Sequence, residues 1–216
     1  RMQSKVILTT TAILILFPAL YFYFGEFRQG SFGTWVLLSL FQSVTPRTAG
    51  FNTADFSQLS ASGQMLTIIL MLIGGSPGST AGGMKTTTLA VLTATAISVF
   101  RRNENPELFK RRIAQETVSD AAAILMMYLS LCLTGAFLIS RIEELPMMAC
   151  MFETASAVGT VGLSFGITPG LGSISRIILI ILMYLGRVGG LTLIYAALSG
   201  HRIRLGKYPL EKITVG

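Results

Sequence analysis

The sequence predicts an all-α integral membrane protein built from two tandem repeats. Hydrophobic residues make up 51% of the 216 residues and charged residues only 12%, which is about half the charge of an ordinary soluble domain. Several apolar runs have the length of a membrane span, and two shorter ones do not. The order span, half-span, loop, span occurs twice along the chain. These observations place the chain in a lipid bilayer before any motif is considered.

Three apolar runs are predicted to cross the membrane as helices. Residues 6–25 and 121–140 contain no charged residue. Residues 175–199 qualify apart from Arg176 at one end and Arg187 in the middle. A helix needs about 20 apolar residues to cross about 30 Å of hydrocarbon, and each run meets that length.

A fourth run, residues 64–100, is interrupted by the stretch GGSPGSTAGGMKTTT at residues 74–88. A phosphate-binding P-loop is one interpretation, and it requires a lysine directly after the second of two spaced glycines. Gly78 and Gly83 have the required spacing, but Lys85 comes one residue late. The apolar flanks also favour a broken membrane helix over the buried strand that precedes a P-loop.

Two shorter apolar segments, residues 33–44 and 146–158, are predicted to be re-entrant half-helices. At about 12 residues each they are too short to cross the bilayer. Each runs into a loop that contains glycine. Irregular backbone at membrane depth is tolerated only where it is buried in protein or lines a watery path.

The two halves of the chain also match in their residues. Three pairs of segments correspond: RTAGFN (47–52) with GTVGLS (159–164), LMLIGG (70–75) with LMYLGR (182–187), and GGMKT (82–86) with GGLTL (189–193). The first two pairs are 112 residues apart and the third is 107 apart. The first repeat therefore carries five extra residues between Gly75 and Gly82.

This insertion predicts a functional loop near the membrane midplane. A structural kink is the alternative, but a kink needs only one proline or a Gly/Ser pair. The candidate loop residues are Gly74, Gly75, Ser76, Pro77, Gly78, Ser79, Thr80, Ala81, Gly82, Gly83 and Lys85.

The loops after the two half-helices have the pattern of an ion filter. An extended Thr-Val-Gly segment stacks backbone carbonyls along an axis, and rings of such carbonyls replace the hydration shell of potassium. TVGLS at residues 160–164 stands where TVGYG stands in potassium channels, and TAGF at 48–51 is its partner. The candidate filter residues are Thr48, Ala49, Gly50, Thr160, Val161 and Gly162.

These motifs resemble a known family. The segments SVTPRTAGFNT, GGSPGSTAGGMKTT, ETASAVGTVGLS and GRVGGLT are similar to the last two of four channel-like repeats in the Trk/Ktr/HKT superfamily of potassium transporters. The tail KYPLEKITVG resembles the Ktr membrane subunit in particular. Four repeats in that family surround one pore, so the resemblance implies half of a pore. It also makes the glycine-rich insertion an intramembrane gating loop and Arg187 an arginine that faces the pore.

The resemblance further implies uptake of a monovalent cation, most simply potassium, driven by the membrane potential. Potassium would be the transported ion, with no cofactor. The expected partners are a second copy of the chain and a cytoplasmic ring of nucleotide-binding regulatory subunits. The first filter segment reads TAGF instead of TVGY, which leaves sodium permeation or sodium coupling open.

Basic clusters predict the orientation and the domain limits. Residues 101–112 and 201–212 are rich in Lys and Arg next to apolar spans, as in cytoplasmic segments, whereas nucleic-acid binding would need aromatics between the charges. Both ends of the segment are expected in the cytoplasm of a multi-pass cell-membrane protein. The predicted domains are one repeat at 1–112, another at 113–200, and a cytoplasmic tail at 201–216.

Single charged residues within or beside the spans have structural and functional interpretations. Arg187 has a pore role by default, against a structural ion pair. Lys85 either enters the pore or extends to cytoplasmic water. Glu153 is expected behind the filter, either hydrogen-bonded or paired with a basic group such as Arg47. Asp120 is expected to cap the N-terminus of a span.

Two functions of other classes are alternatives to transport. An intramembrane enzyme could use Arg187 and Lys85, but it lacks a nucleophile–base pair. A structural scaffold would not need two filter-like loops. Cys132 and Cys150 both lie in apolar stretches, so they are expected to pack as free thiols rather than to form a disulfide framework.

Overall fold

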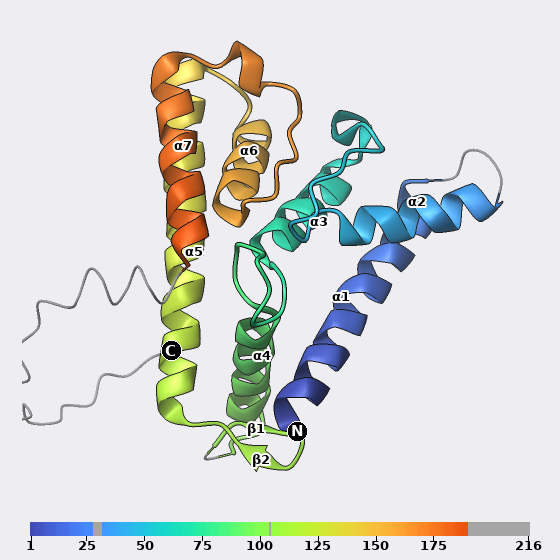
Figure 1. Ribbon diagram of the computed structural model, residues 1–216, viewed down its shortest axis with the longest axis vertical. Coiled ribbons are helices and arrows are strands. Elements are labelled where there is room, and N and C mark those ends of the chain that lie inside the picture. The colour runs from blue at the N-terminus through green and yellow to red at the C-terminus, as the bar shows by residue number, and fades with distance from the viewer. Residues whose placement is uncertain (28–31, 104, 190–216) are drawn as a thin grey trace, which may run out of the picture.

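The computed structural model describes residues 1–27, 32–103 and 105–189 of the chain (Figure 1). In these residues the fold is helical apart from one short hairpin and two single 3-10 turns. The helices are α1 (Met2–Gly25), α2 (Phe32–Val44), α3 (Ala61–Leu72), α4 (Thr86–Phe100), α5 (Gln115–Glu143), α6 (Met147–Gly159) and α7 (Ser173–Val188). The hairpin pairs β1 (Glu107–Leu108) with β2 (Arg111–Arg112). The predicted all-helical class is confirmed.

Two helices, α1 and α5, are long and apolar enough to cross a membrane, with 24 and 29 residues. They contain the predicted spans 6–25 and 121–140. Pro18 lies inside α1, and such a proline is tolerated in membrane helices because neighbouring groups satisfy the freed carbonyl. Helix α7 contains the start of the third predicted span, whereas residues 190–199 and the tail 201–216 lie outside the described residues.

The two predicted half-helices are present as α2 and α6, each with 13 residues. Helix α2 packs on α1, and α6 packs against α5, α7 and α3. Residues 152–159 of α6 are all buried, because three helices surround that end. Helix α6 thus joins the two halves of the molecule (Figure 1).

Aromatic side chains reinforce the contact between the halves. The rings of Phe152 and Phe165 stack with centroids 4.0 Å apart, and Phe56 approaches Phe152 at 5.3 Å. Phe56 and Phe152 are almost completely buried. These rings come from α6 and from the loops that follow α2 and α6, so the core lies next to those loops.

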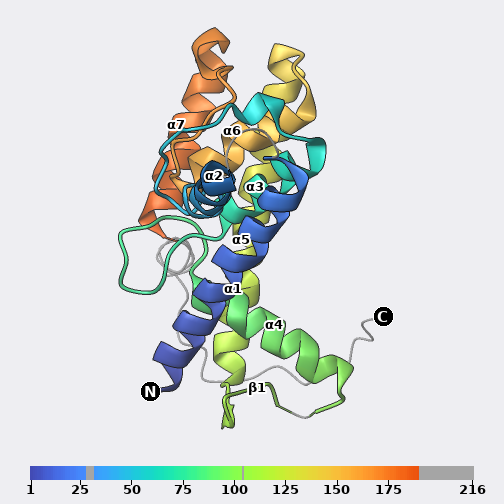
Figure 2. The ribbon, with the colours of Figure 1, turned by 90° about the vertical axis from the view of Figure 1, so that its right-hand side faces the viewer.

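The predicted break in residues 64–100 is confirmed. Helix α3 ends at Leu72 and α4 begins at Thr86. Figure 2 shows the connecting segment projecting from the junction of the two helices. We call residues 74–85 the glycine-rich loop.

Two details differ from the sequence prediction. Asp120 does not cap a helix, because α5 begins at Gln115 with Ala114 as its N-cap. Polar residues extend the helix by more than a turn before the apolar run, and Glu116 in the first turn complements the helix dipole. The hairpin between α4 and α5 was not predicted, and it lies at the same end of the molecule as the N-terminus (Figure 1).

Candidate functional site

The predicted filter residues form two loop segments with the same backbone pattern. The TAG segment (residues 48–50) follows α2, and the TVG segment (residues 160–162) follows α6. Each begins with a threonine of positive φ, 65° at Thr48 and 52° at Thr160, which is uncommon for a residue other than glycine. Each ends with a glycine of positive φ, 74° in the TAG segment and 92° in the TVG segment.

The two segments touch each other. A Cβ atom built on Gly50 would collide with the carbonyl oxygen of Val161, so only glycine fits this approach. Backbone bonds hold each segment to its half-helix. The Gly50 N–H donates to the Thr45 carbonyl at 3.0 Å, and the Val161 N–H donates to the Ser156 carbonyl at 2.9 Å.

Glu153 holds the chain that leaves the TVG segment. Its side chain is only 5% exposed, and it accepts three hydrogen bonds. The donors are the Ser164 hydroxyl at 2.5 Å, the Phe165 N–H at 3.0 Å and the Thr168 hydroxyl at 2.8 Å. Of the two expected roles, the hydrogen-bonded one is confirmed and the pairing with Arg47 is wrong.

Replacing Glu153 with alanine is expected to lower the thermal stability of the full-length protein. The change removes three hydrogen bonds from half-buried donors, and a hydrogen bond contributes about 0.5–1.5 kcal/mol net. The apparent melting temperature in detergent should fall by about 5 °C or more. The matched control is Glu107→Ala, at an exposed position of the hairpin. Equal melting temperatures for the two variants would contradict this role of Glu153.

The glycine-rich loop leaves and re-enters the fold at one point. The Met84 N–H donates to the Leu72 carbonyl at 2.9 Å, and the Gly74 N–H donates to the Met84 carbonyl at 2.8 Å. Ile73 and Met84 form a parallel bridge through these bonds. The loop is therefore a closed excursion between α3 and α4 instead of a simple kink.

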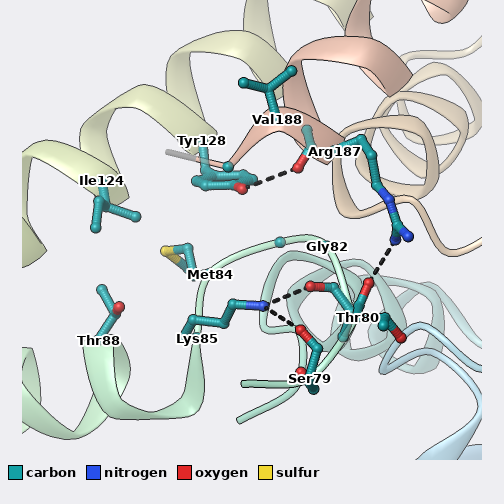
Figure 3. Close-up of a pocket in the computed structure, with 14 residues that line it drawn as sticks. Ser79, Thr80, Gly82, Met84, Lys85, Thr88, Ile124, Tyr128, Arg187 and Val188 are labelled. Atoms are coloured by element: carbon teal, nitrogen blue, oxygen red, sulfur yellow. Dashed lines mark hydrogen bonds between the residues drawn. The ribbon is translucent and has the colours of Figure 1, made fainter. Parts of the chain in front are cut away.

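Lys85 is tied back onto the loop itself (Figure 3). Its Nζ donates to the Ala81 carbonyl at 2.7 Å and to the Ser79 carbonyl at 3.4 Å. Neither expected direction, into a pore or out to cytoplasmic water, describes this arrangement. The lysine instead satisfies carbonyls that the broken helix leaves free.

Arg187 on α7 binds the same loop from the other half of the molecule. One guanidinium nitrogen donates to the Thr80 carbonyl at 2.5 Å (Figure 3). Its partner is thus a backbone carbonyl and not the carboxylate of a structural ion pair. Arg187 also lines two cavities, one of about 420 Å³ beside the glycine-rich loop and one of about 570 Å³ beside the TVG segment.

The glycine-rich loop also touches the TVG segment. A Cβ atom built on Gly82 would collide with the hydroxyl of Thr160 and would lie 2.8 Å from the Gly159 carbonyl. The structure therefore brings together the TAG segment, the TVG segment, the loop and Arg187, all from residues singled out in the sequence.

Tyr128 is a residue of this site that the sequence analysis missed. It is 1% exposed, lines the cavity beside the loop, and donates to the Gly186 carbonyl at 3.4 Å (Figure 3). A tyrosine in the middle of an apolar span was the only available signal. The two cysteines are buried and free, as expected, and Cys132 lies 3.6 Å from the Thr154 hydroxyl.

The described part of the chain has two helices of membrane-spanning length, two short helices that end in glycine loops, and a helix broken at a glycine-rich loop, an arrangement typical of a helical membrane protein. The family model TrkH, described as "Cation transport protein", matches residues 2–201. The chain belongs to this family of cation transport proteins, which confirms the resemblance and excludes the alternative of an intramembrane enzyme.

Similar proteins extend this match. The potassium/sodium uptake protein NtpJ of Enterococcus hirae is 39% identical over 226 residues, covering 100% of this chain and 50% of that protein. The Ktr system potassium uptake protein B of Bacillus subtilis is 33% identical over 221 residues, covering 100% and 49%. The chain spans about half the length of the curated relatives it matches.

A solved structure shares the fold. The crystal structure of the potassium transporter TrkH from Vibrio parahaemolyticus matches with a TM-score of 0.74 at 20% sequence identity. The match covers 89% of this chain and 43% of that chain. At this level of identity the likeness concerns the fold alone.

Proposed function

We propose that this chain forms half of a channel-like pore for the uptake of potassium across the cell membrane. The observation that carries the proposal is the contact between the TAG and TVG segments, which share one backbone pattern and meet at Gly50 and Val161. In the proposed pore the carbonyls of both segments would face a common path, and carbonyls of this kind replace the hydration shell of potassium. The proposed domains are two repeats, 1–112 and 113–200, followed by the tail 201–216.

The glycine-rich loop is proposed as the gate of this pore. Its contact with Thr160 and its bond to Arg187 support a position next to the TVG segment. Arg187 would hold the loop and also place a positive charge beside the ion path. Sodium uptake is the second candidate, since the name of NtpJ includes sodium and the TAG segment lacks the bulkier residues of a channel filter.

The orientation and the partners belong to the same proposal. The N-terminus and the basic hairpin lie at one end of the molecule (Figure 1), which supports a cytoplasmic position for both. Relatives named as parts of a Ktr system imply further components. We expect a homodimer and a cytoplasmic ring of nucleotide-binding subunits.

Ion uptake by the full-length protein that contains this segment tests the proposal. The protein should restore growth and potassium uptake in cells that lack their own potassium uptake systems. Sodium uptake measured in parallel distinguishes the two candidate ions. A protein that is present in the membrane but moves neither ion would instead support a structural scaffold.

Replacing Gly162 with serine is expected to lower the preference of the full-length protein for potassium over sodium. The glycine has a φ of 92°, and although a Cβ atom here would meet no other atom within 4 Å, a side chain is strained at this φ and should shift the backbone carbonyls on either side. The measurement is the uptake kinetics of both ions. Gly166→Ser is a matched control, because Gly166 has a φ of 85° and equally open surroundings but lies beyond the TVG segment. If both variants keep the parent's kinetics, Gly162 does not line a filter.

A further inference from the structure

Two glutamates at the ends of the long helices α1 and α5 make the same kind of contact. Glu26 directly follows α1, and Glu143 is the last residue of α5. Each carboxylate reaches the N-terminus of the helix that follows the filter-like loop of its own half, α3 for Glu26 and α7 for Glu143.

Glu26 accepts two hydrogen bonds from the residue that begins α3. Its Oε2 accepts the Ser60 N–H at 3.0 Å, and its Oε1 accepts the Ser60 hydroxyl. Ser60 is the N-cap of α3, and its own hydroxyl accepts the Gly63 N–H at 3.1 Å. Glu26 therefore extends the cap of α3 from another helix.

Glu143 acts on α7 in a related way. Its Oε1 accepts the Gly172 N–H at 2.9 Å and the Ser175 hydroxyl at 2.5 Å. Gly172 is the N-cap of α7, and a glycine has no side chain with which to cap the helix. A helix N-terminus has free N–H groups and a partial positive charge, and Glu143 satisfies one of these N–H groups and places a carboxylate beside them.

Each contact closes the loop that carries a filter-like segment. In the first half, residues 27–59 lie between the two bonded positions and include α2 and the TAG segment. In the second half, residues 144–171 lie between them and include α6 and the TVG segment. Each contact therefore holds together the two ends of one segment that carries a half-helix and its filter-like loop.

Sequence matching alone does not pair these two glutamates. The N-caps Ser60 and Gly172 are 112 residues apart, like the filter segments, whereas Glu26 and Glu143 are 117 apart. Their equivalence is apparent only from the hydrogen bonds. In both halves a carboxylate nevertheless accepts the backbone N–H of the N-cap residue.

We propose that Glu26 and Glu143 are equivalent positioning residues, each of which holds closed the re-entrant segment that carries one filter segment. This inference rests on the proposed function, because a filter is selective only if its carbonyls are held at defined distances. Neither glutamate touches the ion. Both act through the helix N-termini that they cap.

The test uses the full-length protein reconstituted in liposomes, with the ratio of potassium to sodium flux as the readout. Glu143→Ala should lower this ratio about tenfold, because it removes two charge-assisted hydrogen bonds, one from the buried Ser175 hydroxyl and one from the exposed Gly172 N–H. Glu143→Gln should stay within about twofold of the parent, because a single amide oxygen can keep both bonds. Glu26→Gln should fall between these values, because its two bonds use both carboxylate oxygens and an amide nitrogen cannot accept.

Glu144→Ala and Glu144→Gln are the matched controls. Glu144 is the next residue, is exposed, and makes no side-chain hydrogen bond within the described part of the chain. Should Glu143→Ala fail to fold, Ser175→Ala removes one of the two bonds and should lower the ratio by a smaller factor. The glutamine variants and the serine variant therefore keep the inference testable.

The outcomes separate this inference from the proposed function. A parent protein that moves neither potassium nor sodium refutes the function itself. A selective parent whose Glu143→Ala and Ser175→Ala variants match the Glu144 controls refutes the positioning role. Equal losses in Glu143→Gln and Glu143→Ala would also refute it, because charge and not hydrogen bonding would then matter. A lower flux of both ions at an unchanged ratio would also refute the positioning role, because the contact would then contribute only to the general stability of the protein.

Discussion

Removing residues 77–81 from the full-length protein is expected to give faster ion flux and a weak response to the proposed regulatory partner, if the glycine-rich loop is the proposed gate. The remaining Gly-Gly-Ser-Gly-Gly matches Gly-Arg-Val-Gly-Gly at residues 186–190 in length. The deletion removes the three carbonyls that Lys85 and Arg187 bind, those of Ser79, Thr80 and Ala81. With the loop gone, α3 can continue toward α4 with its backbone groups satisfied internally.

Steady-state uptake and the regulator response should be measured together on purified, reconstituted protein. Pro77→Ala is the control, since it changes the same segment but keeps all three carbonyls. The control should retain the flux and the regulation of the parent. A folded deletion variant that depends on the regulator as strongly as the parent does would show that the glycine-rich loop is a structural excursion and not a gate.

Replacing Arg187 with glutamine is expected to raise cation flux about fivefold or more. Its bond to the Thr80 carbonyl, at 2.5 Å, is charge-assisted but made by an exposed side chain, and such a bond contributes about 1 kcal/mol. If the bond exists only when the loop blocks the path, its loss shifts the loop equilibrium by a factor of about five. Removing a positive charge beside the proposed ion path also lowers an electrostatic barrier.

The matched control is Arg176→Gln. Arg176 lies on the same helix and donates to the Pro169 carbonyl at 2.7 Å, far along the chain from the glycine-rich loop. Its variant should keep the parent flux. A folded Arg187→Gln protein with equal or lower flux than the parent would exclude both proposed effects of Arg187. These are the hydrogen bond that holds the loop, here called the latch, and the electrostatic barrier to cations.

Combining the two changes separates the latch from the barrier. In the variant without residues 77–81 the Thr80 carbonyl is absent, so Arg187→Gln can act only through its charge. The latch then predicts a smaller increase in flux on the deletion background than on the parent, and residues in contact are expected to be non-additive in this way. Equal increases on both backgrounds would assign the whole effect to charge.

The helices could be predicted because a bilayer permits few alternatives. Apolar runs of about 20 residues must be helical there, and shorter runs that end in glycine must turn back. For the same reason the break after Leu72 was visible as a change in composition. The start of α5 was less predictable, because polar residues at a membrane surface can be helical or irregular. Gln115 and Asp120 are both strongly polar, so hydropathy does not indicate at which of them the helix begins.

Side-chain partners were much less predictable than helices. Lys85 and Arg187 are long side chains whose direction depends on where the backbone of the glycine-rich loop runs, and composition does not encode that path. Glu153 was expected behind the filter, but its three donors lie 11 to 15 residues further along the chain. Glu26 and Glu143 were not identified as a pair, because their spacing departs from that of the repeat.

The parallel bridge between Ile73 and Met84 has a consequence for how the glycine-rich loop can move. Because its two ends are tied together, the loop is in effect a tethered flap, and swinging it aside does not require α3 and α4 to separate. Its motion then involves a few backbone torsions and the exchange of three carbonyls between protein donors and water. Loops move on nanosecond to microsecond timescales, faster than collective helix motions. A flap of this kind could open and shut many times while the surrounding helices stay where they are.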